Sequence, residues 1–160
     1  MSFEKENTEL KKETKDIDKL IRDIHRHLGQ YTKRNLKKKD LTMPRFIVLW
    51  HIIKQQPVNM SFLHEKLYMA NSTLTIIVDK LVEEELVKRY RNPEDRREVL
   101  LELTDKGDDL LCKMLYARQN FLEQALADLA PDKQQVMIEL LGTILNNLKK
   151  SLQEGNNIDE

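Results

Sequence analysis

The spacing of apolar residues in this 160-residue chain changes from helical to alternating between residues 87 and 104, and this change constrains the fold most. On both sides, apolar residues recur three, four and seven positions apart, as in amphipathic helices. Between them, the strand-like segments Val87–Arg91 and Glu98–Thr104 flank the turn-forming sequence Asn92-Pro93-Glu94-Asp95. The pattern predicts one β-hairpin in a helical chain. A two-stranded hairpin needs helices to pack against.

Four helices are predicted before the hairpin. The first carries a narrow apolar stripe from Ile17 to Tyr31, typical of a helix–helix seam rather than a broad core face. The second begins with Thr42 as its N-cap and stops before Pro57. We expect the second helix to bury Phe46, Ile47, Leu49, Trp50 and Ile53.

The third and fourth helices are shorter. The third is expected to begin after Ser61, and the fourth to be capped by Asn71 or Ser72. Their predicted buried residues are Leu63, Leu67 and Tyr68 in the third helix and Leu74, Ile77, Val78, Leu81 and Val82 in the fourth.

Two long helices are predicted after the hairpin. Thr104 is expected to cap the first of them, and Pro131 to end it and start the second. Cys112 lies among Leu110, Leu111 and Met114 and is therefore expected to be buried. Both chain ends carry more apolar surface than one small domain needs, which predicts a dimer interface.

These elements define a mainly α fold with a minor β part, namely a winged helix-turn-helix with a two-stranded β wing and long terminal dimerisation helices. We expect three parts: an N-terminal dimerisation helix in residues 1–40, a winged helix-turn-helix in 41–104 and C-terminal dimerisation helices in 105–160.

The charges balance, with 27 basic and 27 acidic residues, so net charge gives no indication of a nucleic-acid partner. Their distribution does, because a basic face can form on a neutral protein. Residues 1–12 lack the apolar centre of a signal peptide, no apolar run would span a bilayer, and a single cysteine suits a reducing compartment. We therefore expect a cytoplasmic protein without a membrane partner. The basic clusters are Lys33, Arg34, Lys37, Lys38 and Lys39, and Lys88, Arg89, Arg91, Arg96 and Arg97.

The fourth helix and the hairpin form the predicted DNA-binding surface. The outward face of the fourth helix is small and polar at its N-terminal part, which allows close approach to base edges in the major groove. Paired arginines at the hairpin tip suit the negative potential of a narrow minor groove, whereas Asp95 is expected to orient an arginine or fix the turn. The predicted DNA-binding residues are Ser72, Thr73, Thr75, Ile76, Lys80, Arg89, Arg91, Asp95, Arg96 and Arg97.

Five segments carry a recognisable pattern, namely Ser72-Thr73-Leu74-Thr75, Val78-Asp79-Lys80-Leu81, Leu86-Val87-Lys88-Arg89, Asn92-Pro93-Glu94-Asp95-Arg96-Arg97 and Leu101-Glu102-Leu103-Thr104-Asp105-Lys106-Gly107. With them, the chain resembles the MarR family of bacterial and archaeal regulators over about residues 15–152. The resemblance implies a homodimer on a pseudo-palindromic double-stranded operator, acting as a repressor that a small organic effector or a redox input releases. It also implies that Arg97 enters the minor groove with Asp95 as its partner. Two residues depart from the family pattern: Ile76 replaces a frequent basic residue, and Glu85 a frequent glycine.

Other functions have less support. No nucleophile–base pair or nucleotide loop indicates an enzyme, and the four histidines and Cys112 lack the spacing of a metal site. No metal and no cofactor are therefore predicted. A winged helix that contacts only protein, and a metal- or redox-responsive regulator, remain alternatives. By resemblance, an effector pocket would include Ile24, His27, Tyr31, Trp50 and Met114.

Overall fold

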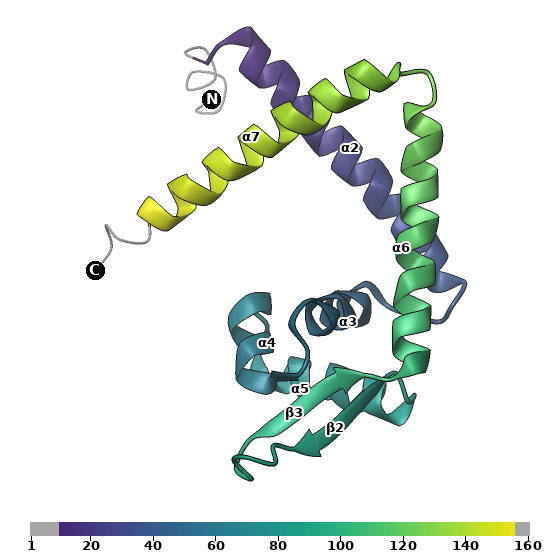
Figure 1. Cartoon of the computed structure of the whole chain (residues 1–160), viewed down its shortest axis with the longest axis vertical. Coiled ribbons are helices and arrows are strands. Elements are labelled where there is room, and N and C mark those ends of the chain that lie inside the picture. The colour runs from purple at the N-terminus through teal and green to yellow at the C-terminus, as the bar shows by residue number, and fades with distance from the viewer. Residues whose placement is uncertain (1–9, 156–160) are drawn as a thin grey trace, which may run out of the picture. The chain divides into compact units, whose positions relative to one another are not determined.

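The computed structural model describes residues 10–155, so the outermost residues of the predicted terminal parts, 1–9 and 156–160, lie outside it. By contact density the chain forms two compact units, which divide after Gln119. The mainly α class with a winged helix-turn-helix is confirmed (Figure 1). In order, the elements are α2 (Lys12–Lys37), α3 (Met43–Gln55), β1 (Val58–Asn59), α4 (Met60–Leu67), α5 (Asn71–Glu83), β2 (Val87–Arg91), β3 (Val99–Leu103), α6 (Asp105–Leu126) and α7 (Pro131–Gly155).

The core of the first unit lies between α3, α4, α5 and the sheet. Leu49, Leu63 and Leu74 are fully buried there, as predicted. The prediction for α3 was partly wrong, because Val48 and Ile52 are also fully buried. Val48, Leu49 and Ile52 lie on one side of α3, a helix that contacts α5 and β3, and the helical period places their neighbours at the edge of that side. Phe46, Ile47, Trp50 and Ile53 are consequently only half-buried.

The ends of the two short helices differ from the prediction. α4 begins at Met60 rather than after Ser61, because Asn59 caps it: its Oδ1 accepts a hydrogen bond of 2.8 Å from the N–H of Phe62. Tyr68 is not buried but 94% exposed, since it ends α4 in the left-handed conformation with φ 49°. The N-cap of α5 is Ala70, not Asn71 or Ser72.

The sheet has three antiparallel strands in the order β1-β3-β2, one more than predicted. Val87 pairs with Leu103 and Arg91 with Val99, which forms the predicted hairpin. The additional strand β1 pairs Val58 with Leu101 along the other edge of β3. Leu101 lies in the core, so the hairpin is anchored from both sides.

The start of α6 is fixed to the corner between α5 and β2. Thr104 is the predicted cap, and its Oγ1 accepts from the N–H of Gly107 at 3.1 Å and donates to the carbonyl of Glu85 at 2.6 Å. A Cβ on Gly107 would lie only 2.0 Å from the carbonyl oxygen of Leu86. Glu85 itself has φ 58°, the left-handed conformation that glycine adopts without strain. A glutamate at this position therefore leaves a strained exit from α5.

Cys112 is exposed, contrary to prediction. The buried side of α6 runs through Gly107, Leu111 and Met114. Each helical residue turns the chain by roughly 100°, so the residue after Leu111 leaves the core. Apolar neighbours in sequence do not by themselves bury a side chain.

The long helices at the two chain ends expose their apolar stripes. In α2 the exposed residues are Ile17, Leu20, Ile21 and Ile24, whereas Thr32 and Leu36 are buried. No described residue of α7 is buried. Its exposed apolar residues are Val136, Met137, Ile138, Leu140, Leu141, Ile144, Leu145, Leu148 and Leu152.

Candidate nucleic-acid interface

The outward face of α5 is the first part of the candidate site. The helix packs Leu74, Ile77, Val78 and Leu81 inward, so the remaining positions point away from the core. Ile76 is 70% exposed near the middle of this outward face. The predicted residues Ser72, Thr73, Thr75, Ile76 and Lys80 are all exposed on it.

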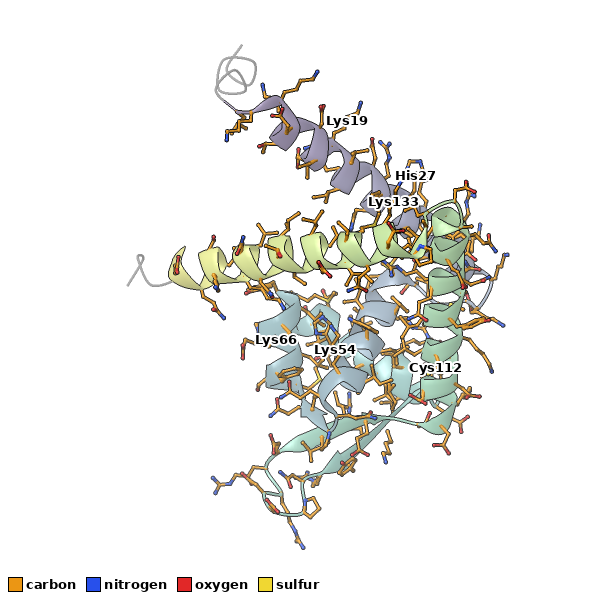
Figure 2. All side chains as sticks on the ribbon, turned by 45° about the horizontal axis from the view of Figure 1, so that its top comes forward. Lys19, His27, Lys54, Lys66, Cys112 and Lys133 are labelled. Carbon is orange, nitrogen blue, oxygen red and sulfur yellow. The ribbon has the colours of Figure 1, made fainter. Side chains whose placement is uncertain are left out.

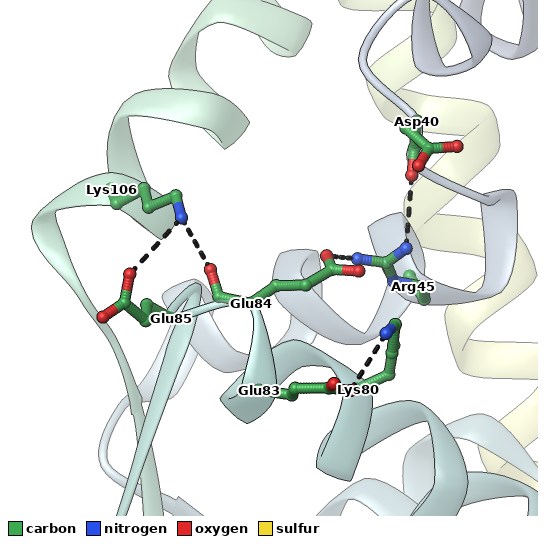
Figure 3. A network of polar contacts seen from close by, with 7 residues as sticks. All are labelled: Asp40, Arg45, Lys80, Glu83, Glu84, Glu85 and Lys106. Carbon is green, nitrogen blue, oxygen red and sulfur yellow. Dashed lines mark hydrogen bonds and ion pairs between the residues drawn. The ribbon is translucent and has the colours of Figure 1, made fainter.

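Several polar groups on this face already have intramolecular partners. The hydroxyl of Thr75 donates to the carbonyl of Asn71 at 2.9 Å. The ammonium of Lys80 lies 2.9 Å from a carboxylate oxygen of Glu83, as Figure 3 shows. Arg89 of β2, another predicted contact, lies 2.7 Å from the carboxylate of Asp79. An ion-paired cation attracts phosphate less strongly than an unpaired one.

The wing tip carries two of the other predicted cations, Arg96 and Arg97. Asp95 fixes the turn, as predicted, by accepting from the N–H of Arg97 at 2.9 Å with its side chain and from the N–H of Glu98 at 2.9 Å with its carbonyl. Arg91 is bound to the same loop, because its guanidinium donates to the carbonyl of Arg96 at 2.7 Å. Arg96 and Arg97 are exposed, and no carboxylate in residues 10–155 forms an ion pair with either.

Glu98 holds the wing to the helix-turn-helix, a contact that sequence reasoning missed. Its carboxylate accepts from the amide of Asn92 at 2.6 Å and from the amide of Asn59. Asn59 is also the N-cap of α4. One carboxylate therefore connects the base of the wing loop to the first helix of the motif. The hydrogen bonds from Asn59 and Asn92 lower the pKa of Glu98, because they stabilise its charged form.

A second polar group lies further down the hairpin. Glu102 lies 2.5 Å from the ammonium of Lys88 and accepts from the hydroxyl of Tyr90 at 2.8 Å. These hydrogen bonds lower the pKa of Glu102 and raise that of Lys88. Cross-strand pairs of this kind hold the register of a hairpin. The ammonium of Lys88 is therefore paired within the wing.

The C-terminal end of α5 is held by the contacts in Figure 3. Arg45 of α3 pairs with Glu84 and donates to the carbonyl of Asp40 at 3.2 Å. Lys106 of α6 donates to the carbonyl of Glu84 at 2.8 Å and lies 3.7 Å from Glu85. Burial lowers the pKa of Arg45, against the effect of Asp40. These contacts fix α5 relative to α3 and α6.

The five residues of the predicted effector pocket lie in different environments. Ile24 and His27 are exposed on α2, and Met114 lies in the core. Trp50 of α3 has the ammonium of Lys54 4.5 Å from its ring centre. Tyr31 lines a hollow of about 580 Å³ with Arg34, Asn35, Lys37 and Lys38, without the other four predicted residues. Their role in binding a ligand stays a prediction.

The histidines and Cys112 give no sign of a metal site. Within residues 10–155, no three His, Cys, Asp or Glu side chains gather as metal ligands would. Figure 2 labels His27 and Cys112 on separate helices, and Cys112 has the carboxylate of Asp108 4.0 Å from its sulfur. None of the described helices is both long and apolar enough to cross a membrane.

A compact helical motif that is followed by an arginine-tipped hairpin defines the class of winged helix-turn-helix proteins. The sequence model of the MarR family matches residues 41–99. The HTH-type transcriptional regulator YsmB of Bacillus subtilis is 26% identical over 135 residues, which are 84% of this chain and 92% of YsmB. Residues 41–99 of the chain are thus similar to the MarR family, and most of the chain is similar to an HTH-type transcriptional regulator.

Solved structures show the same similarity. A MarR family protein from Bacillus stearothermophilus superimposes with a TM-score of 0.80 at 25% identity, over 88% of this chain and 99% of that one. A mutant of Staphylococcus aureus MepR, bound to an oligodeoxyribonucleotide, gives a TM-score of 0.64 at 19% identity, over 82% and 97%. At that identity, the likeness to MepR shows the shared fold.

Proposed function

We propose that the protein is a homodimeric transcriptional regulator that binds a pseudo-palindromic double-stranded DNA operator in the cytoplasm. The observation that carries this proposal is the exposed, polar N-terminal part of α5 beside a wing whose two arginines have no acidic partner within residues 10–155. α5 would enter the major groove, with Ser72 and Thr73 near base edges. Arg97 would enter the adjacent minor groove.

The dimer rests on the exposed apolar faces of α2 and α7. On a helical wheel the apolar residues of α7 span roughly 200°, which is wider than one neighbouring helix covers. The stripe on α2 is narrow and continuous from Ile17 to Ile24. Monomeric proteins rarely leave such extended apolar surface in water. A second copy of the chain would bury these faces and place two copies of α5 on one operator.

Control by an effector is the remaining part of the proposal. We expect repression that ends when a small organic molecule binds near Ile24, His27, Tyr31, Trp50 and Met114 and alters the spacing of the two α5 helices. Replacing Tyr31 and Trp50 together by alanine should then abolish release by the effector while DNA binding persists. Release that is unchanged in this variant would contradict the pocket assignment.

Fluorescence anisotropy tests DNA binding directly. The full chain is titrated with the duplex upstream of its own gene and with a scrambled duplex, at two salt concentrations. We expect selective binding that weakens with salt, because each neutralised phosphate releases counterions with a log–log slope of about −0.9. Arg97→Ala should lower the affinity by about ten- to a hundredfold, as for other specific groove contacts.

The matched control is Lys113→Ala, which removes one positive charge from α6. Lys113 is exposed on α6 and paired with Asp109. The DNA affinity of the Lys113→Ala variant should stay within about twofold of the wild-type affinity, as expected for a screened charge outside the interface. Equal losses in both variants would mean that the wing contributes only bulk charge. The absence of duplex binding at low salt would favour the protein-contact alternative.

A further inference from the structure

The winged helix-turn-helix exposes two large apolar side chains, and both belong to the recognition segment. Within residues 41–104, all of which the structure describes, only Tyr68 and Ile76 are large hydrophobic residues classed as exposed. Tyr68 forms the turn before α5, and Ile76 lies on the second turn of α5. The other large hydrophobic side chains of this region are buried or half-buried.

Ile76 lies at the centre of the outward face of α5. On a helical wheel it is roughly 140° from Leu81, a fully buried residue, and between Ser72 and Lys80. A side chain at this position would point to the floor of the major groove if α5 enters it. An exposed β-branched residue gains nothing for the helix, because isoleucine has a lower helix propensity than alanine or lysine.

The polar residues around Ile76 offer little direct reading of bases. Lys80 is paired with Glu83, Asp79 is paired with Arg89, and the hydroxyl proton of Thr75 is donated to Asn71. None of these side chains supplies the bidentate donor pair with which arginine reads guanine. Ser72 and Thr73 remain, but each hydroxyl can pair with several bases.

From this combination we infer that α5 reads thymine through its 5-methyl group, with the side chain of Ile76 as the contact. Thymine is the base that presents a methyl group in the major groove of unmodified DNA. Each operator half-site should therefore hold at least one thymine under Ile76. The inference rests on the proposed DNA binding and names the base class that this surface selects.

Deoxyuridine tests the inference, because it pairs like thymidine and lacks only the methyl group. A duplex is first selected from a random library with the full chain. Each thymidine is then replaced by deoxyuridine, one position at a time, and binding is measured by anisotropy. At one or two positions per half-site we expect an affinity loss of about fourfold, as for one methyl group left unburied. Replacement in both half-sites should give about fifteenfold, because distant effects multiply.

Two variants complete the test. Ile76→Ala should bind the thymidine and deoxyuridine duplexes equally, since the contact is absent, and its fold is safe because Ile76 is exposed. Arg97→Ala should bind both duplexes more weakly but keep the fourfold difference, because the wing is a separate contact. This pattern would assign the methyl contact to Ile76 rather than to a change in DNA stiffness.

The other outcomes separate this inference from the proposed function. Selective binding that no deoxyuridine position weakens would overturn the inference and leave the regulator intact. A methyl effect that persists in Ile76→Ala would also overturn it, because another side chain or the DNA itself would be responsible. If no duplex is selected even at low salt, the proposed function fails and the inference fails with it.

Discussion

The winged helix-turn-helix and α7 use their apolar residues in opposite ways. Leu49, Leu63 and Leu74 of the former are fully buried within one chain, whereas Leu145 of α7 is 52% exposed. The winged helix-turn-helix should therefore have a stability that does not depend on protein concentration. The apolar face of α7 contributes to stability only when another surface covers it. The stability of α7 should therefore rise with protein concentration.

The largest effect is expected for a substitution in the apolar face of α7. Leu145→Glu places a charge in the proposed interface, and leaving such a charge buried costs about 4 kcal/mol, or roughly a thousandfold in dimer affinity. Light scattering after size exclusion should show a monomer. Hydrogen-exchange measurements should show that the amides of α5 and β3 are still protected, because these elements pack into a core within one chain.

The control for this change is Asn146→Glu. Asn146 is the next residue of α7 and is also exposed, but it lies outside the apolar face. We expect this variant to remain a dimer. A Leu145→Glu protein that stays dimeric at nanomolar concentration would refute the proposed interface.

The second prediction concerns the first unit alone. Gly107→Ala should destabilise it by about 3 kcal/mol, because the new Cβ would overlap the carbonyl of Leu86 and the backbone there cannot move without breaking contacts. Chemical denaturation measures this loss. Gly29→Ala is the matched control: no atom lies within 4 Å of its Cβ position, so it should stabilise α2 by about 0.8 kcal/mol.

A smaller effect is expected for the contact between wing and helix. Glu98→Gln keeps the shape of the side chain, but its amide cannot accept from both Asn59 and Asn92. We expect the wing to lose its fixed orientation and DNA affinity to fall by about fivefold, a loss of the size of one hydrogen bond. In a double-mutant cycle with Arg97→Ala, the two losses should not add, because both act through the wing.

The pH dependence of this contact has a definite sign. The folded pKa of Glu98 is lowered, so its contribution is present above the ordinary pKa of 4.5 and is lost as pH falls through the lower folded pKa. Hairpin amide protection should decline in that acidic range in the wild type. Glu98→Gln should lack this part of the decline.

The smallest effect is expected at His51 of α3. Burial, followed by Lys54 and Lys66, lowers its pKa below 6.5. The neutral form is therefore favoured by folding, and stability should decrease as pH falls from 6.5 through the folded pKa. The resulting decrease of the melting temperature over this pH range should be within about 2 °C. His51→Gln should remove it, and an unchanged slope would assign it to other groups.

The sequence allowed the elements with a repeated period to be predicted. Leu74, Ile77 and Leu81 of α5 recur at the helical spacing, and the wing joins two strands through a turn of known composition. The motif residues from Asp95 to Gly107 indicated the resemblance to the MarR family, whose sequence model matches residues 41–99. Strand β1 has only two residues, which is too short for an alternating pattern.

Contacts between distant residues could not be predicted. Asn59 and Glu98 are 39 positions apart, and neither carries a motif. Tyr68 is apolar by type, but its left-handed backbone places it in solvent. The ion pair between Asp79 and Arg89 also requires the fold to be known, and it changes which cations of the candidate site are free.

Because Gly107 lies so close to Leu86, residues can be inserted into the chain at some positions and not at others. An extra residue in the wing loop near Pro93 and Glu94 would change only the reach of the hairpin, since both are outside the paired strands. An extra residue between Thr104 and Gly107 would turn the following part of α6 by roughly 100°. It would also replace glycine beside the Leu86 carbonyl. The fold of this protein should therefore tolerate an insertion in the wing loop but none at the start of α6.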